Sequence, residues 1–139
     1  MKKKLVVYLA TPYALVVKSK EIGISKQIYA EQDKALRVTR FVAVNDVAAK
    51  LIGCGFAVIS PISQSHPIAV QCNLGGTFET WEDIDYNIIL RCDMVIVFCQ
   101  YGWQDSVGVQ KEIAFALQNN IPVIYIDEDL KLMEGECKK

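Results

Sequence analysis

The fold follows most directly from two neighbouring stretches, Met94-Val95-Ile96-Val97-Phe98 and Asp105-Ser106-Val107-Gly108-Val109-Gln110-Lys111-Glu112. The first is a short, continuous apolar run, which is typical of a strand buried on both faces of a sheet. The second opens a helical pattern that continues to Leu117. Serine and glycine at a helix start can hold an anion, and a glutamate one turn further in can face whatever carries it. The unit therefore predicts an α/β fold with a phosphorylated small molecule beside a carboxylate nucleophile.

Similar patterns lie on both sides of this unit. Apolar runs predict buried strands over residues 5–10, 56–59, 94–98 and 121–126. Helical spacing predicts helices over 34–52, 77–91 and 106–118. Residues 13–32 read as a long loop or a partly helical excursion, and 62–76 as a loop. Alternating strands and helices predict a Rossmann-like (flavodoxin-like) parallel sheet of four or five strands with helices on both faces. A single domain over residues 1–139 is expected from the length.

Two of the predicted helices carry more specific expectations. Asp33 is expected to cap the helix 34–52, whose apolar positions run most of the way round it. Such a helix is expected to be covered by the sheet on one side and by a second subunit on the other. On the helix 77–91, Phe78, Trp81, Ile84 and Ile88 recur at helical spacing and are expected to face the core, with Ile89 as a further candidate.

Composition narrows the class of protein. The net charge of -1 and the pI near 5.8 do not favour polymeric nucleic acid or a membrane surface as partner. Lys2 to Lys4 precede an apolar stretch that is too short for a membrane span, so a soluble cytoplasmic protein is expected. The five cysteines show no C-x-x-C spacing and His66 is the one histidine, so no metal site is expected.

In a parallel sheet of this kind, ligands bind beyond the carboxyl ends of the strands. Residues 8–13, 60–66 and 100–112 each follow or end a predicted strand, so we expect them to converge there. This placement locates a site without specifying its chemistry.

Three features of the chain resemble the nucleoside 2-deoxyribosyltransferase-like superfamily. They are the strand end Tyr8-Leu9-Ala10-Thr11-Pro12-Tyr13, Asp85 placed eight residues before Asp93, and the pattern Ser106-x-Gly108-x-x-x-Glu112. The segment 60–67 and Gly102-Trp103 look most like a small branch of that superfamily, near its deoxynucleoside 5'-monophosphate N-glycosidases. The resemblance covers nearly the whole chain, with the features in the same order.

The resemblance implies cleavage or transfer at an N-glycosidic bond, without metal or cofactor. Glu112 matches the carboxylate that attacks the anomeric carbon, Asp85 the acid/base that protonates the departing nucleobase, and Tyr8 the hydroxyl that hydrogen-bonds the nucleophile. This chemistry suits an oxocarbenium-like transition state, which a carboxylate below the sugar can trap. The resemblance also implies a homo-oligomer, a dimer or tetramer, in which a neighbour completes the pocket.

Position 106 bears on the substrate. Serine there, with Gly108, resembles the monophosphate glycosidases, whereas the transferases acting on unphosphorylated nucleosides usually carry an acid. Asp105 would oppose a phosphate if it faced the pocket, and the loop 93–106 is longer than in the glycosidases. Alternatively, Ser106 is only a helix cap.

Further substrate-binding candidates flank these positions: Thr11, Pro12, Tyr13, His66, Trp103 and Arg40. Trp103 could stack on a base. His66 could contact phosphate or base, or only form a turn, and Arg40 could reach the anion or be exposed. Two alternative functions stay open, a non-catalytic nucleotide-binding or sensing domain and an NAD-type glycohydrolase.

Overall fold

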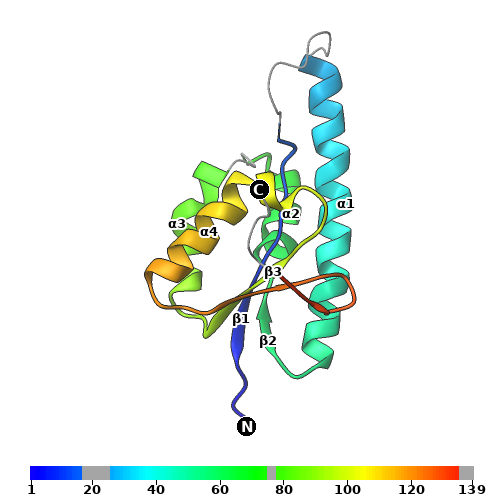
Figure 1. Cartoon of the computed structure of the whole chain (residues 1–139). Coiled ribbons are helices and arrows are strands. Elements are labelled where there is room, and N and C mark those ends of the chain that lie inside the picture. The colour runs from blue at the N-terminus through cyan, green and yellow to red at the C-terminus, as the bar shows by residue number, and fades with distance from the viewer. Residues whose placement is uncertain (17–25, 75–77, 135–139) are drawn as a thin grey trace.

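Five strands form a single sheet in the order β2-β1-β3-β4-β5 in the computed structural model, which describes residues 1–16, 26–74 and 78–134 (Figure 1). β1 to β4 are parallel and β5 pairs antiparallel with β4. The strands are β1 Val6–Ala10, β2 Ala57–Ile59, β3 Met94–Phe98, β4 Val123–Ile126 and β5 Leu132–Met133. The predicted flavodoxin-like α/β class is confirmed, because 2-1-3-4-5 is the flavodoxin order.

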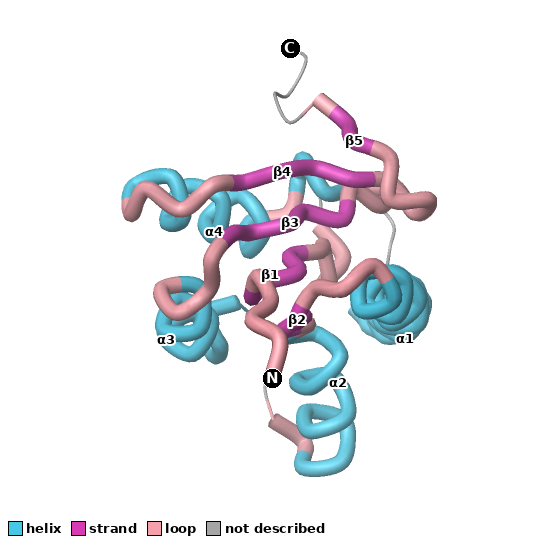
Figure 2. The backbone as a smooth tube through the Cα atoms, turned by 90° about the horizontal axis from the view of Figure 1, so that it is seen from below, coloured by secondary structure: helices cyan, strands magenta, loops and turns pink. Residues whose placement is uncertain are grey.

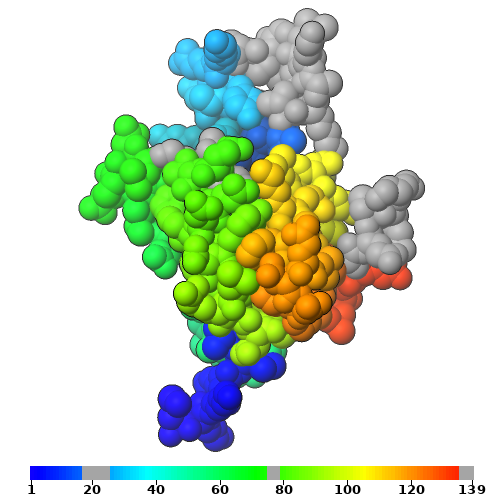
Figure 3. All heavy atoms as spheres, turned by 90° about the vertical axis from the view of Figure 1, so that its left-hand side faces the viewer, coloured from blue at the N-terminus to red at the C-terminus, as the bar shows by residue number. Residues whose placement is uncertain are grey.

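Helices cover both faces of this sheet, as predicted. They are α1 Lys26–Gly53, α2 Pro61–Cys72, α3 Phe78–Ile89 and α4 Val107–Gln118, with a short 3-10 helix, η1 Trp103–Asp105, before α4. Figure 2 shows α1 on one face, α3 and α4 on the other, and α2 beyond β2 at the sheet edge. In Figure 3, α3 and α4 lie side by side and fill most of their face. None of the helices in the described ranges is long and apolar enough to cross a membrane.

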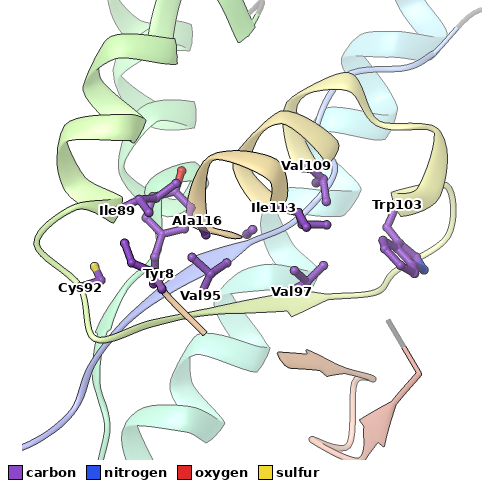
Figure 4. Packing of buried hydrophobic residues seen from close by; sticks show 11 residues of the cluster. Tyr8, Ile89, Cys92, Val95, Val97, Trp103, Val109, Ile113 and Ala116 are labelled. Atoms are coloured by element: carbon purple, nitrogen blue, oxygen red, sulfur yellow. The ribbon is translucent and has the colours of Figure 1, made fainter. Parts of the chain in front are cut away.

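Alternation along β1 divides the core into two layers. Tyr8 and Ala10 face α3 and α4, whereas Val7 and Leu9 face α1, because successive strand side chains point to opposite faces. Figure 4 shows the first layer, in which Tyr8 lies among residues of β3, α3 and α4. A tyrosine at this buried position places its hydroxyl at the junction of β1, α3 and α4.

The prediction for α1 was wrong at its N-terminus. α1 begins at Lys26, eight residues before the expected start, and Asp33 lies inside it. The Asp33 carboxylate accepts from the Leu15 backbone N–H at 2.7 Å and from Arg37 Nε at 2.9 Å, so it ties α1 to the chain after β1. The residues before Asp33 include strong helix formers, which extend the helix. Residues 17–25 of the expected loop 13–32 lie outside the described residues.

The expected loop over 62–76 is also wrong, because most of it is helix α2. Ser60 occupies the N-cap position and Pro61 the first turn, where a missing N–H is no loss. Pro67 lies inside the helix, and an interior proline normally argues against one. Asn73 ends α2 in the left-handed conformation at φ 55°. Residues 75 and 76, where two glycines suggested a turn, lie outside the described residues.

α1 is much longer than the strands it covers. Its 28 residues span roughly 42 Å, whereas the five residues of β1 span about 17 Å. The residues of α1 that are buried all lie from Arg40 to Leu51. The half before Arg40 therefore projects past the carboxyl ends of the strands, as Figure 1 shows. Val38 and Val42 are exposed on α1, and their covering by a second subunit stays a prediction.

Candidate active site

A cavity of about 380 Å³ lies at the carboxyl ends of β1 and β3. Its walls come from β1 and the segment after it, the projecting half of α1, α2, α3 and the start of α4. It occupies the point where the connection after β1 goes to one face of the sheet and the connection after β3 goes to the other, which is where such sheets bind ligands. The volume suits a small organic ligand.

Three buried polar side chains meet at the inner end of this cavity. Tyr8 comes from β1, Asp85 from α3 and Glu112 from α4, and all three line the cavity. The Tyr8 hydroxyl donates to Glu112 Oε2 at 2.6 Å, and Asp85 interacts through its side chain with both. Their exposed fractions are 1%, 9% and 6%. The sequence predicted this group, and the structure brings it together from positions 104 residues apart.

Burial controls the protonation of the two carboxyl groups. Loss of solvent raises the pKa of Asp85 to about 6. Burial, together with the charge of Asp85, raises the pKa of Glu112 well above its usual range, and the Tyr8 hydrogen bond opposes that rise. Two carboxyl groups in contact titrate as a pair, because the charge on one disfavours ionisation of the other. One group can then act as an acid while the other is an anion.

The start of α4 forms another part of the wall. Ser106 is the N-cap, and its hydroxyl accepts from the Val109 N–H at 3.3 Å. Ser106 and Gly108 both line the cavity, so a helix N-terminus with free N–H groups faces it. Asp105 is exposed and is absent from the lining. The cap predicted for Ser106 is confirmed, and the position of Asp105 removes the expected obstacle to an anion.

Seven of the predicted site residues line the cavity together: Tyr8, Thr11, Tyr13, Asp85, Ser106, Gly108 and Glu112. Pro12 is fully buried between Thr11 and Tyr13 and stays outside the lining. Its ring therefore contributes to the packing behind the wall.

Trp103 does not lie where a stacking residue would. Its ring is buried in the core layer of α3 and α4 and packs against Tyr125 at 5.5 Å between ring centroids. Figure 4 shows the side chain next to Val97, at the end of β3. The prediction that it lines the pocket is wrong, because η1 turns the ring inward to fill the core.

Arg40 and His66 also lie behind the wall. Arg40 is neither exposed nor part of the lining, and its guanidinium donates to two backbone carbonyls, at Ala14 and at Tyr101. His66 belongs to α2, stacks on Phe41 at 4.4 Å and shares a hydrogen bond between Nδ1 and the Tyr13 hydroxyl. His66 therefore supports Tyr13 from behind. Neither Arg40 nor His66 lines the cavity, so neither is in place to contact a ligand directly.

The sequence reading missed several residues of the lining. Arg37 is the one cationic side chain among the described lining residues, and its guanidinium lies 4.8 Å from the Tyr13 ring centroid. Trp81, expected in the core, lines the cavity instead, while Ile84 is exposed. The inner face of α3 is occupied by Asp85 and Ile89, which are one turn apart. The sequence pattern did not identify this face as the inner one, because an acid such as Asp85 usually marks the solvent side of a helix.

Residues 5–128 match the profile of a family described as a domain of unknown function (DUF1937). The chain belongs to this family. The matched range contains every residue that lines the cavity, from Tyr8 to Glu112. A comparison with curated proteins found no match. In the described ranges of this DUF1937 chain, no three His, Cys, Asp or Glu side chains group closely enough to hold a metal ion.

Proposed function

We propose that this DUF1937 protein cleaves the N-glycosidic bond of a nucleoside 5'-monophosphate, with water or a second base as acceptor. The observation that carries the proposal is the buried group of Tyr8, Asp85 and Glu112 at the inner end of a ligand-sized cavity. Two interacting carboxyl groups with raised pKa values in a cleft are characteristic of acid/base sites. The resemblance to the nucleoside 2-deoxyribosyltransferase-like superfamily supports the same assignment of roles.

The proposed reaction has two steps. In the first, a Glu112 oxygen bonds to the anomeric carbon while the bond to the base nitrogen breaks, and Asp85 donates its proton to that nitrogen. In the second, Asp85 takes a proton from water, whose oxygen bonds to the anomeric carbon and releases the Glu112 carboxylate. A second base in place of water gives transfer. The reactive form carries the proton on Asp85 and the negative charge on Glu112, and the Tyr8 hydroxyl stabilises that charge through its hydrogen bond to Glu112.

Two features of the cavity support a phosphate on the substrate. The start of α4 presents Ser106 and Gly108 to the cavity, where backbone N–H groups favour an anion. Arg37 adds a guanidinium to the same lining, and a guanidinium can bind two phosphate oxygens at once. Since the carboxylate pair is itself partly anionic, a phosphorylated substrate needs such a counter-charge.

The test is a base-release assay on a panel of ribo- and deoxynucleoside 5'-monophosphates and the matching nucleosides, with and without an acceptor base. We expect release from a monophosphate, its loss in Glu112→Gln, and full retention in the control Glu128→Gln, whose side chain is exposed. Binding by thermal shift with no release from any substrate would refute the enzyme and favour a nucleotide-binding domain. Release of nicotinamide from NAD alone would move the substrate to dinucleotides.

A further inference from the structure

The cavity exists because two connections diverge. β1 and β3 are paired neighbours, but the chain after β1 leads to α1 on one face and the chain after β3 leads through η1 to α4 on the other. The first connection carries Tyr13 and the second carries Ser106, and both line the cavity. The two connections therefore contribute separate parts of the cavity wall.

One buried side chain spans the two connections. Arg40 Nη1 donates to the Ala14 carbonyl at 2.9 Å, and Arg40 Nη2 donates to the Tyr101 carbonyl at 2.7 Å. Ala14 itself lines the cavity, next to Tyr13. The Arg40 side chain is 6% exposed and does not line the cavity. A guanidinium suits this position because its planar fork directs separate N–H groups to two acceptors.

The second connection is shaped to receive this guanidinium. Gly102 has φ 88°, a conformation that favours glycine, and a Cβ built on it would lie 2.7 Å from Arg40 Nη2. The backbone at position 102 therefore favours glycine, and a side chain there would displace the Arg40 guanidinium. Beyond it, the buried Trp103 ring anchors the chain, and the Ser106 N–H donates to the Trp103 carbonyl at 3.3 Å. Gly102 and Ser106 are thus linked through Trp103.

A parallel link reinforces the same junction. Gln100 Nε2 donates to Thr11 Oγ1 at 2.7 Å, and it lies 3.4 Å from the Arg40 carbonyl oxygen. The Thr11 hydroxyl in turn donates to the Phe98 carbonyl at 3.4 Å. These bonds join the first residues after β1 and β3, while Arg40 joins the chain further out.

From this geometry we infer that Arg40 is a positioning residue that fixes the phosphate end of the cavity, by holding the Tyr13 connection at a set distance from Ser106. The inference rests on the proposed function. Arg40 acts through the backbone and touches no substrate. The proposed catalytic group lies on β1, α3 and α4, whose positions the core fixes without Arg40. Loss of the Arg40 hydrogen bonds should therefore affect binding of the monophosphate more than the chemical step.

The test compares Arg40→Lys, which keeps the charge but has one nitrogen for two acceptors, with Arg91→Lys, an exposed control on the other side of the sheet. For the monophosphate that wild type cleaves, Arg40→Lys should raise KM about tenfold and leave kcat within about twofold, as expected for loss of one charged hydrogen bond. Gly102→Ala should act in the same way, and the double variant should be less than additive. A fall in kcat at unchanged KM would overturn the inference.

Hydrogen exchange provides a readout that needs no activity. Amides in residues 13–16 and 100–106 should exchange faster in Arg40→Lys and Gly102→Ala than in wild type or Arg91→Lys. Unchanged exchange in both segments would overturn the inference that Arg40 fixes the two connections. If wild type releases no base, the proposed function fails, whereas these exchange rates still decide whether Arg40 fixes the two connections.

Discussion

Replacing Asp85 by asparagine should make the protein more stable while abolishing its activity. Asp85 is buried beside Glu112, and its pKa is raised from the ordinary value of 3.8 to about 6, chiefly by burial. The folded state therefore holds the proton more tightly than the unfolded state. The resulting stability is fully present below the unfolded pKa and is lost as pH rises from 3.8 through about 6. Asparagine resembles the protonated acid and avoids this loss.

The size of the effect follows from the two pKa values. At about 1.4 kcal/mol per pH unit, the difference between 3.8 and about 6 corresponds to about 3 kcal/mol at neutral pH. At pH 4.5 most of the folded protein still carries the proton, and the loss is only about 1 kcal/mol. The stability gain of Asp85→Asn should therefore be about 2 kcal/mol larger at pH 7.5 than at pH 4.5.

Urea unfolding of wild type and Asp85→Asn at the two pH values measures this difference directly. Asp83→Asn is the matched control, because it removes an exposed carboxylate from the same helix. Its stability relative to wild type should change little between the two pH values. If the stability change of Asp85→Asn depends on pH as little as that of Asp83→Asn, or if Asp85→Asn gains no stability at pH 7.5, then burial does not raise the pKa of Asp85 and the reasoning about the pair is wrong.

Three further substitutions test the other parts of the site. Tyr8→Phe removes the hydroxyl that donates to Glu112 at 2.6 Å, and base-release kcat should fall about ten- to hundredfold with little change in KM. Ser106→Ala should lower stability by about 1 kcal/mol through loss of the cap and should raise KM for the monophosphate far more than for the nucleoside; equal rises would leave only a cap. Trp103→Phe should lower the thermal midpoint by a few degrees at unchanged KM, because the ring packs in the core; a large KM increase alone would restore its stacking role.

The sequence predicted the elements whose pattern is dense and uninterrupted. β3 agrees with its predicted bounds, and α4 differs by one residue at its start, because a five-residue apolar run and a capped helix leave few alternatives. α2 was missed because Pro67 suggested a break, although Pro61 after Ser60 is a usual helix start. The N-terminal half of α1 lacks a buried apolar face, so no hydrophobic period reveals it.

The predicted convergence of side chains is found where the motif fixes both residue and element. Glu112, Asp85 and Tyr8 belong to regular elements, and their side chains converge as the fold requires. Directions of side chains on loops and short helices were not predictable in this way. Trp103 on the short helix η1 turns into the core, because local backbone geometry decides its direction. Arg40 lies on the long helix α1, but its two acceptors are carbonyls of separate connections, which sequence spacing does not locate.

Because half of α1 projects beyond the sheet, the outer wall of the cavity and the buried carboxyl pair lie on separate parts of the structure. The groups proposed to break the bond stand on elements buried in the core, whereas Arg37 and Tyr29 stand on a helical segment beyond the sheet. Most substitutions in such a segment change stability little, since few buried contacts depend on it. This outer wall can therefore be re-engineered for other ligands while the buried group of Tyr8, Asp85 and Glu112 is left intact.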